Sequence, residues 1–144
     1  VESDRFTKVD EVLASFMNSG SADIKATQNW TTHEWLHFIN SIPDSITAEQ
    51  LAKLDEAYAF TASNNSEISA AWFQPTIAAN YEAVYPKVES FLVSVGRRKF
   101  LTPTYKALLG AKQDQLARDI YKKARPNYHA VSRETMDDLL KWEE

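Results

Sequence analysis

Residues 31–58 read TTHEWLHFINSIPDSITAEQLAKLDEAY and contain two helix starts in succession. Thr31-x-x-Glu34 and Thr47-x-x-Gln50 are capping boxes, in which a Thr side chain and the Glu or Gln three residues later bond to each other's free backbone amides. A proline lies between the two boxes and cannot continue the first helix. The stretch therefore predicts two short helices with a tight connection, and helices joined in this way pack antiparallel.

The same pattern of caps and apolar residues recurs along the rest of the chain. Three Gly and five Pro leave little material for hairpin turns, and apolar residues stand three or four apart rather than alternating. The expected fold class is all-α, with about eight short antiparallel helices. Either an α-α superhelix of the solenoid kind or a compact bundle would bury helices this short. The other predicted helices run from Ser3 to Ser19 and begin at Asn64 (a capping box with Glu67), Pro86, Thr102-Pro103, near Leu116 and at Ser132.

Charge is distributed unevenly along the 144 residues. The net charge is -4, yet residues 97–125 hold nine basic residues against two acidic ones. The acidic remainder argues against general nucleic-acid binding, and no apolar run approaches the roughly 20 residues that cross a bilayer. The absence of Cys excludes disulfides, thiolate zinc sites and thiol nucleophiles. The length suits one domain, and a start at Val1 rather than Met indicates a piece of a longer protein.

Residues 33–37, HEWLH, match the zinc-peptidase motif H-E-x-x-H. In such motifs two His one helical turn apart bind the metal, and the Glu activates the metal-bound water as a general base. Glu56 stands at the spacing of the third metal ligand of the gluzincin subclass. A stand-alone zinc peptidase that uses His33, Glu34, His37 and Glu56 is therefore one hypothesis for the function.

The helical pattern argues against this zinc hypothesis. On a helical wheel His33 and His37 lie opposite the apolar stripe that must face the core. Glu34 already belongs to a capping box, and Glu56 lies away from the apolar stripe of its own helix. We therefore expect two exposed His and two exposed Glu, at most a weak adventitious metal site at His33 and His37, and far less than one zinc ion per chain.

The basic block begins at residues 96–100, which read GRRKF. Arg97 and Lys99 are two apart, and in an extended stretch this spacing sends both side chains to one side, where they can grip one carboxylate or phosphate. Arg98 would then point elsewhere. A solvated basic turn is the alternative structure. The alternative function is a helical-repeat scaffold that binds an acidic protein partner through residues 97–125.

Two longer stretches carry a family resemblance. The first is residues 58–72, YAFTASNNSEISAAW, and the second is residues 96–108, GRRKFLTPTYKAL. Both resemble signature stretches of the leukotriene A-4 hydrolase family of bifunctional zinc aminopeptidases, in the same order and at a similar separation. The tail around Tyr121 and His129 also fits, so that the resemblance covers about residues 28–140.

The resemblance implies a fold for this chain and places catalysis in a different domain of the same protein. Family members are three-domain gluzincins whose zinc and catalytic Glu belong to a central thermolysin-like domain, so we expect no catalytic or metal-binding residue here and no activity of this chain alone. Their C-terminal domain is a two-layered superhelix of antiparallel helices that helps to wall the substrate channel. Residues 28–144 are the expected C-terminal helical domain, and residues 1–27 are its N-terminal helix and junction with the catalytic domain.

The resemblance also implies a role for two basic residues. The family uses an Arg and a Lys of a Gly-Arg-x-Lys-Phe segment to bind the free C-terminal carboxylate of short peptides, and these positions match Arg97 and Lys99. The expected partners are the catalytic domain of the same parent chain, which would hold the zinc, and short peptides, with no nucleic acid and no membrane. The expected compartment is the cytoplasm. Exposed apolar surface, where the catalytic domain docks, is expected near Phe6, Phe16 and Met17.

Overall fold

The computed structural model describes residues 2–22 and 24–142. This part of the chain forms eight α-helices and three short 3-10 helices, and it contains no strand. None of the described helices combines the length and the apolar character that a bilayer span requires. The α-helices are α1 (Glu2–Ser19), α2 (Thr32–Asn40), α3 (Ala48–Tyr58), α4 (Ser66–Ala78), α5 (Tyr85–Ser94), α6 (Arg98–Gly110), α7 (Asp114–Ala124) and α8 (Ala130–Leu140), and the 3-10 helices are η1 (Lys25–Thr27), η2 (Glu82–Val84) and η3 (Arg125–Asn127).

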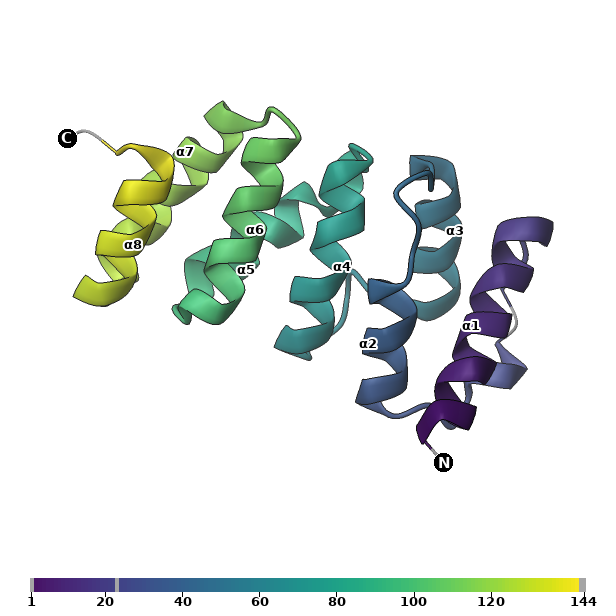
Figure 1. Cartoon of the computed structure of the whole chain (residues 1–144). Helices are drawn as coiled ribbons and strands as arrows, with labels where there is room; N and C mark the ends of the chain where they lie inside the picture. The colour runs from purple at the N-terminus through teal and green to yellow at the C-terminus, as the bar shows by residue number, and fades with distance from the viewer. Residues whose placement is uncertain (1, 23, 143–144) are drawn as a thin grey trace.

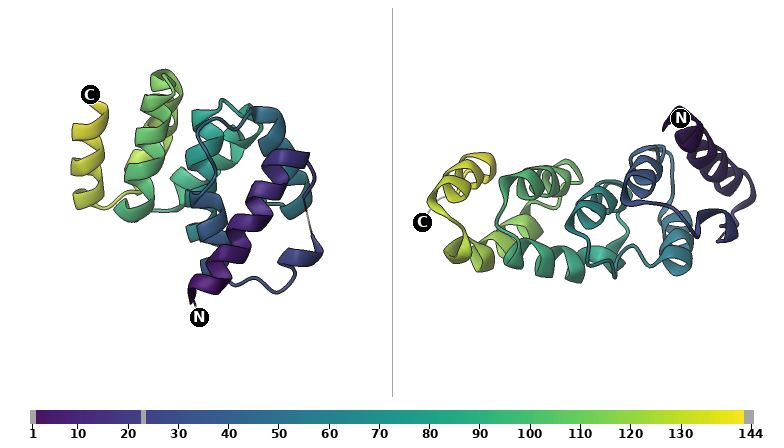
Figure 2. Two further views of the ribbon diagram at one scale, coloured as in Figure 1. Left: turned by 45° about the vertical axis from the view of Figure 1, so that its right-hand side comes forward. Right: turned by 90° about the horizontal axis from the view of Figure 1, so that it is seen from below.

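The helices form two layers in an elongated, curved stack (Figure 1). One layer contains α1, α2, α4, α6 and α8, and the other contains α3, α5 and α7 (Figure 2). From α2 onward successive helices alternate between the layers, so that the helices within one layer run in the same direction. The two ends of the chain lie at opposite ends of the stack. The predicted all-α superhelix is confirmed, and the compact bundle is excluded.

Both capping boxes form where they were predicted. The Thr31 amide donates to Glu34 Oε1 over 3.1 Å, and the Glu34 amide donates to Thr31 Oγ1 over 3.4 Å. Thr47 and Gln50 make the equivalent bonds over 2.9 Å and 3.2 Å. These contacts satisfy amides that helix geometry leaves without a partner, and they therefore define the starts of α2 and α3.

Two of the predicted cap residues are displaced, by one and by three residues. The cap of α4 is Asn65 and not Asn64, because the Asn65 side chain accepts a hydrogen bond from the Glu67 amide over 2.9 Å. The helix α8 begins two residues before Ser132, the predicted cap. The Ser132 hydroxyl donates instead to the Gly96 carbonyl over 3.0 Å, so that it joins two segments rather than starting a helix.

The start of α6 differs most from its prediction. The helix begins at Arg98, four residues before the predicted start at Thr102. Phe100 and Leu101 are buried and already belong to the apolar face of this helix. Pro103 removes one backbone hydrogen bond inside the helix. The burial of Phe100 and Leu101 offsets that loss, which is why the proline does not mark the helix start.

The expected apolar surface near the amino-terminal end is largely covered. Phe16 is only 1% exposed, so the expectation for this residue is wrong. The Phe6 ring stacks on the His37 ring at a centroid distance of 4.3 Å, and Met17 packs against the core. These contacts arise because α1 lies along α2 and turns its apolar side toward the stack.

A network of polar and aromatic side chains holds α8 at the far end. Nε and Nη2 of Arg125 donate to the two carboxylate oxygens of Asp137, each over 2.9 Å. The Tyr121 hydroxyl donates to the same carboxylate. The hydrogen bonds from Arg125 hold the pKa of Asp137 below its usual value. A paired, charge-assisted contact of this kind is stronger than a neutral hydrogen bond.

Asp137→Asn is expected to lower the free energy of unfolding by about 1–2 kcal/mol near neutral pH, because it weakens this charge-assisted pair. A carboxyl group whose pKa falls on folding stabilises the protein above its unfolded pKa, and this stabilisation is lost as the pH falls through the folded value. The unfolded value here is close to 3.8. Urea unfolding at neutral pH and at about pH 3 should therefore show that wild type and variant differ less in free energy of unfolding at the lower pH. An equal difference at both pH values would contradict this assignment.

Candidate functional site

The amino-terminal ends of α2, α4, α6 and α8 lie along one edge of their layer, the lower edge in Figure 1. Residues 96–100 belong to this edge, because residue 97 is the cap residue of α6. No side chain caps this helix end. Since the amino terminus of a helix carries a partial positive charge and free amides, the edge favours an anion.

Arg97 and Lys99 are brought together at this helix end. The backbone of Arg97 is extended (φ -81°, ψ 125°), but Lys99 lies in the first turn of α6, so the predicted extended path through both residues is wrong. Both side chains nevertheless lie against one aromatic ring. Arg97 Cζ is 5.9 Å and Lys99 Nζ is 5.4 Å from the centroid of Phe100, which is itself 6% exposed. The start of α6, rather than an extended strand, therefore places both cationic groups beside the Phe100 ring.

Lys99 already contacts a carboxylate. Its Nζ lies 2.6 Å from Oε1 of Glu67, which joins the first turn of α6 to the first turn of α4. The two side chains remain 55% and 44% exposed. An exposed ion pair of this kind contributes at most about 1 kcal/mol, and an ammonium group has three donors. A second carboxylate can therefore bind beside Glu67 or displace it.

The neighbouring Arg98 turns in a different direction. Its Nη1 donates to Oγ1 of Thr135 on α8 over 3.4 Å, whereas Lys99 turns toward α4. The bond from Ser132 to the Gly96 carbonyl also comes from α8. The segment is therefore attached to α8 on one side and to α4 on the other.

The rest of the basic block is partly engaged within the molecule. Lys123 Nζ lies 3.0 Å from Oε1 of Glu89 on α5, and Arg125 is paired with Asp137. Lys123 lies on α7 in the second layer and Arg125 lies in η3, the connection into α8, whereas Arg97 precedes α6. The block is thus divided among different surfaces, which weakens the hypothesis of a single acidic partner bound along residues 97–125.

The four residues of the zinc hypothesis do not converge. His37 Nε2 lies 2.8 Å from Oδ1 of Asp10, and the His37 side chain is 30% exposed. The expectation that this His is fully exposed is therefore wrong, because α1 covers that side of α2. Glu34 serves the cap of α2, while His33 and Glu56 are exposed on separate helices. Within residues 2–22 and 24–142 no group of three or more His, Cys, Asp or Glu side chains is placed to hold a metal ion.

Sequence reasoning missed one residue of the site and one helix boundary. Glu67 is 32 positions away from Lys99, and nothing local to either residue pairs them. The apolar spacing of Phe100, Leu101 and Tyr105 was a signal that α6 begins before its proline. That spacing would have placed Lys99 on a helix from the sequence alone.

Comparisons with known proteins agree with this architecture. The family model for "Leukotriene A4 hydrolase, C-terminal" matches residues 30–140. Leucine aminopeptidase 2 of Chaetomium globosum is 33% identical over 117 residues, which cover 79% of this chain and 19% of that protein. Aminopeptidase B of Mus musculus is 26% identical over 137 residues, which cover 88% of this chain and 21% of that protein. The chain spans about a fifth of the length of these curated relatives.

A solved structure shares the fold. The structure of native yeast LTA4 hydrolase aligns with a TM-score of 0.82 at 16% sequence identity, over 98% of this chain and 26% of that one. The matched residues 30–140 contain both of the stretches that carry the resemblance, residues 58–72 and 96–108. The chain therefore belongs to the leukotriene A4 hydrolase C-terminal family.

Proposed function

We propose that the chain is the helical C-terminal domain of a zinc aminopeptidase, in which Arg97 and Lys99 bind the free C-terminal carboxylate of short peptides. The contact between Lys99 and Glu67 is the observation that carries this proposal. The Glu67 carboxylate lies where the peptide carboxylate would approach the ammonium group. Arg97 adds a guanidinium beside the same Phe100 ring, and the uncapped start of α6 adds positive potential.

Binding of the far end of a peptide contributes to catalysis through positioning. When a guanidinium and an ammonium hold the carboxylate, the free energy of this remote contact can place the scissile bond in register with the reacting groups. Such a site favours short peptides with a free carboxylate over peptides with a blocked end. In this proposal the layer edge that holds Arg97 and Lys99 forms part of the wall of the substrate channel.

The proposal leaves the chemistry to the catalytic domain of the same parent chain. The described residues of this chain contain no group of three or more His, Cys, Asp or Glu side chains that could hold zinc. A zinc ion held by the catalytic domain would supply activation of the attacking water. The residues described here would bind and orient the substrate only.

Arg97→Ala and Lys99→Ala, made in the aminopeptidase that carries this chain, are each expected to lower kcat/KM for a free-acid tripeptide by about ten- to hundredfold. This is the effect of losing one hydrogen bond to a charged group. Hydrolysis of the same tripeptide with an amidated C-terminus should change little. Arg98→Ala is the matched control, because its side chain turns toward Thr135.

Two outcomes would contradict the carboxylate role. One is an equal loss for the free-acid and the amidated tripeptide, and the other is the same selective loss in Arg98→Ala. Glu67→Gln extends the test, because it removes the competing carboxylate while preserving side-chain length. In this variant KM for the free-acid tripeptide should fall and KM for the amide should not.

A further inference from the structure

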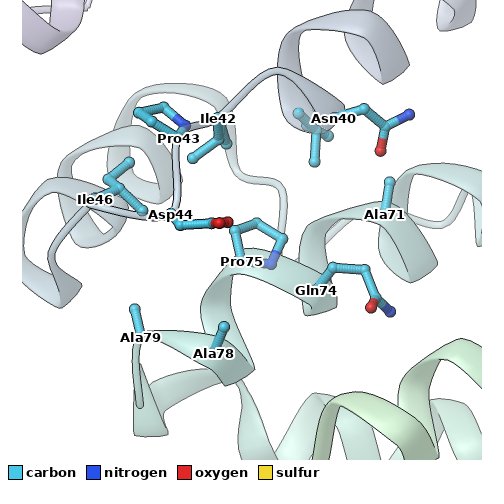
Figure 3. Close-up of a pocket in the computed structure, with 11 residues that line it drawn as sticks. Asn40, Ile42, Pro43, Asp44, Ile46, Ala71, Gln74, Pro75, Ala78 and Ala79 are labelled. Atoms are coloured by element: carbon cyan, nitrogen blue, oxygen red, sulfur yellow. The ribbon is translucent and has the colours of Figure 1, made fainter. Parts of the chain in front are cut away.

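A small recess lies between the carboxyl-terminal half of α4 and the segment that follows α2 (Figure 3). It has a volume of 190 Å³, which is comparable with the cavity of about 150 Å³ that accommodates benzene in another protein. Most of its lining residues are apolar, among them Ile42, Pro43, Ile46 and Pro75, although polar atoms form nearly as much of the exposed wall as apolar ones. Its lining residues on α4 run from Ala71 to Ala78, about 6 to 16 Å along the helix from Glu67. Neither Glu67 nor Lys99 lines the recess, so it is separate from the proposed carboxylate site.

One charged side chain borders this recess. Asp44 points its carboxylate toward Pro75, into the space between the labelled residues (Figure 3). The amides of Asn40 and Gln74 lie at the opposite side from Ile46. No Lys, Arg or His is among the described residues that line the recess, and none of the ion pairs found between described residues involves Asp44.

The backbone makes the same recess more negative. The helix α2 ends at Asn40 and α4 ends at Ala78, and both residues line the recess. Helix carboxyl-terminal ends carry a partial negative charge. Pro75 has no N–H group to donate to the carbonyl of Ala71, which also lines the recess. Two helix ends and a carboxylate thus meet beside an aliphatic surface.

We propose that this recess binds a small alkylammonium group, with the ammonium against Asp44 and the aliphatic chain along the Ile and Pro walls. The negative potential repels an anion, and a neutral aliphatic molecule leaves the Asp44 carboxylate without a counter-charge. A bare metal cation gains nothing from the aliphatic walls, which are poor ligands for it. The inference is independent of the carboxylate site at Arg97 and Lys99.

An NMR titration of the isotope-labelled 144-residue chain with n-pentylammonium tests the proposal. Saturable shift changes are expected at the amides of residues 39–42, 44–46, 74 and 76–79, with a dissociation constant on the order of 1 mM. The uncharged probe 1-pentanol should bind at least about tenfold more weakly, because it lacks the charge-assisted contact. N-acetyl-lysine methylamide distinguishes the source of the ammonium. Tighter binding than pentylammonium indicates a lysine side chain, and weaker binding indicates a free amine.

Two variants separate the charge of the recess from its shape. Asp44→Asn should weaken pentylammonium binding at least about tenfold while leaving the fold intact, since Asp44 is exposed. Ala79→Leu keeps the carboxylate but fills the recess, and it should also abolish binding. Asp138→Asn, which removes an exposed Asp on α8, is the matched control and should bind as wild type does.

Several results would overturn the proposal. They are equal affinity for 1-pentanol and pentylammonium, unchanged binding in Asp44→Asn or Ala79→Leu, and shift changes that lie outside the recess. The absence of saturable changes at about 50 mM pentylammonium, well above the expected dissociation constant, would also overturn it.

Discussion

Trp72→Ala is expected to lower the free energy of unfolding by about 3–5 kcal/mol, the usual cost of deleting a buried large aromatic side chain. Trp72 is 0% exposed, and its ring packs against Phe60 at a centroid distance of 4.7 Å. Its indole N–H donates to Thr61 Oγ1 over 2.9 Å. Since a domain of this size is stable by about 5–15 kcal/mol, this loss is a large share of the total.

Urea unfolding followed by circular dichroism measures the effect of Trp72→Ala. Trp72→Phe is the matched control, because it keeps an aromatic ring in the core and removes the hydrogen bond to Thr61. It should cost less than half as much as the alanine variant. If Trp72→Ala lowered the free energy of unfolding by less than about 1 kcal/mol, the surrounding residues would have filled the cavity, and the packing of Trp72 would not be a major source of stability.

Asp55→Ala is expected to lower the free energy of unfolding by about 2–3 kcal/mol, because the Asp55 carboxylate accepts hydrogen bonds from three donors. Asp55 accepts from the Thr61 amide over 3.0 Å, from the Thr61 hydroxyl over 2.6 Å and from the Tyr81 hydroxyl over 3.0 Å. These bonds join α3 to the turn that follows it and to the segment before η2. Hydrogen bonds to a charged group are worth more than neutral ones, and their loss leaves partly buried donors unsatisfied.

Tyr81→Phe is the matched control for Asp55→Ala, because it removes one of the three bonds and should cost about 1 kcal/mol. Burial, together with the bond to Asp55, raises the pKa of Tyr81 to about 12. A group whose pKa rises on folding stabilises the protein below its unfolded value, and this contribution is lost as the pH rises through the folded value. The difference in free energy of unfolding between wild type and Tyr81→Phe should therefore decrease as the pH rises from about 10 toward 12. Equal costs for Asp55→Ala and Tyr81→Phe would contradict the three-bond account.

The helices could be predicted where the signal is local. The capping boxes at Thr31 and Thr47 use side chains within three residues of the amides they satisfy, and both formed as predicted. The prediction failed at Ser132, whose hydroxyl bonds to the carbonyl of Gly96 on another segment. It failed at Thr102 because burial of Phe100 outweighed the local signal of a proline.

The candidate site was predictable in its residues but not in its geometry. Arg97 and Lys99 could be named from their spacing and from the resemblance of the segment that contains them. Their shared contact with Phe100 depends on the start of α6, and the carboxylate of Glu67 reaches Lys99 only because α4 and α6 are neighbours in one layer. The recess beside Asp44 likewise requires the packing of α4 against the segment after α2.

The sequence by itself determined the all-α class, most helix positions, the place of the basic block and the family. Caps, apolar spacing and signature stretches act over a few neighbouring residues, so they can be read without coordinates. The tertiary structure alone decided which helix ends share an edge and which charges meet there. It set Glu67 beside Lys99, Asp10 beside His37, and two helix carboxyl-terminal ends beside Asp44. Apart from the end of α2, which lies four residues before Asp44, those pairings join residues far apart in the chain, because the stacking of successive helices into two layers brings them together.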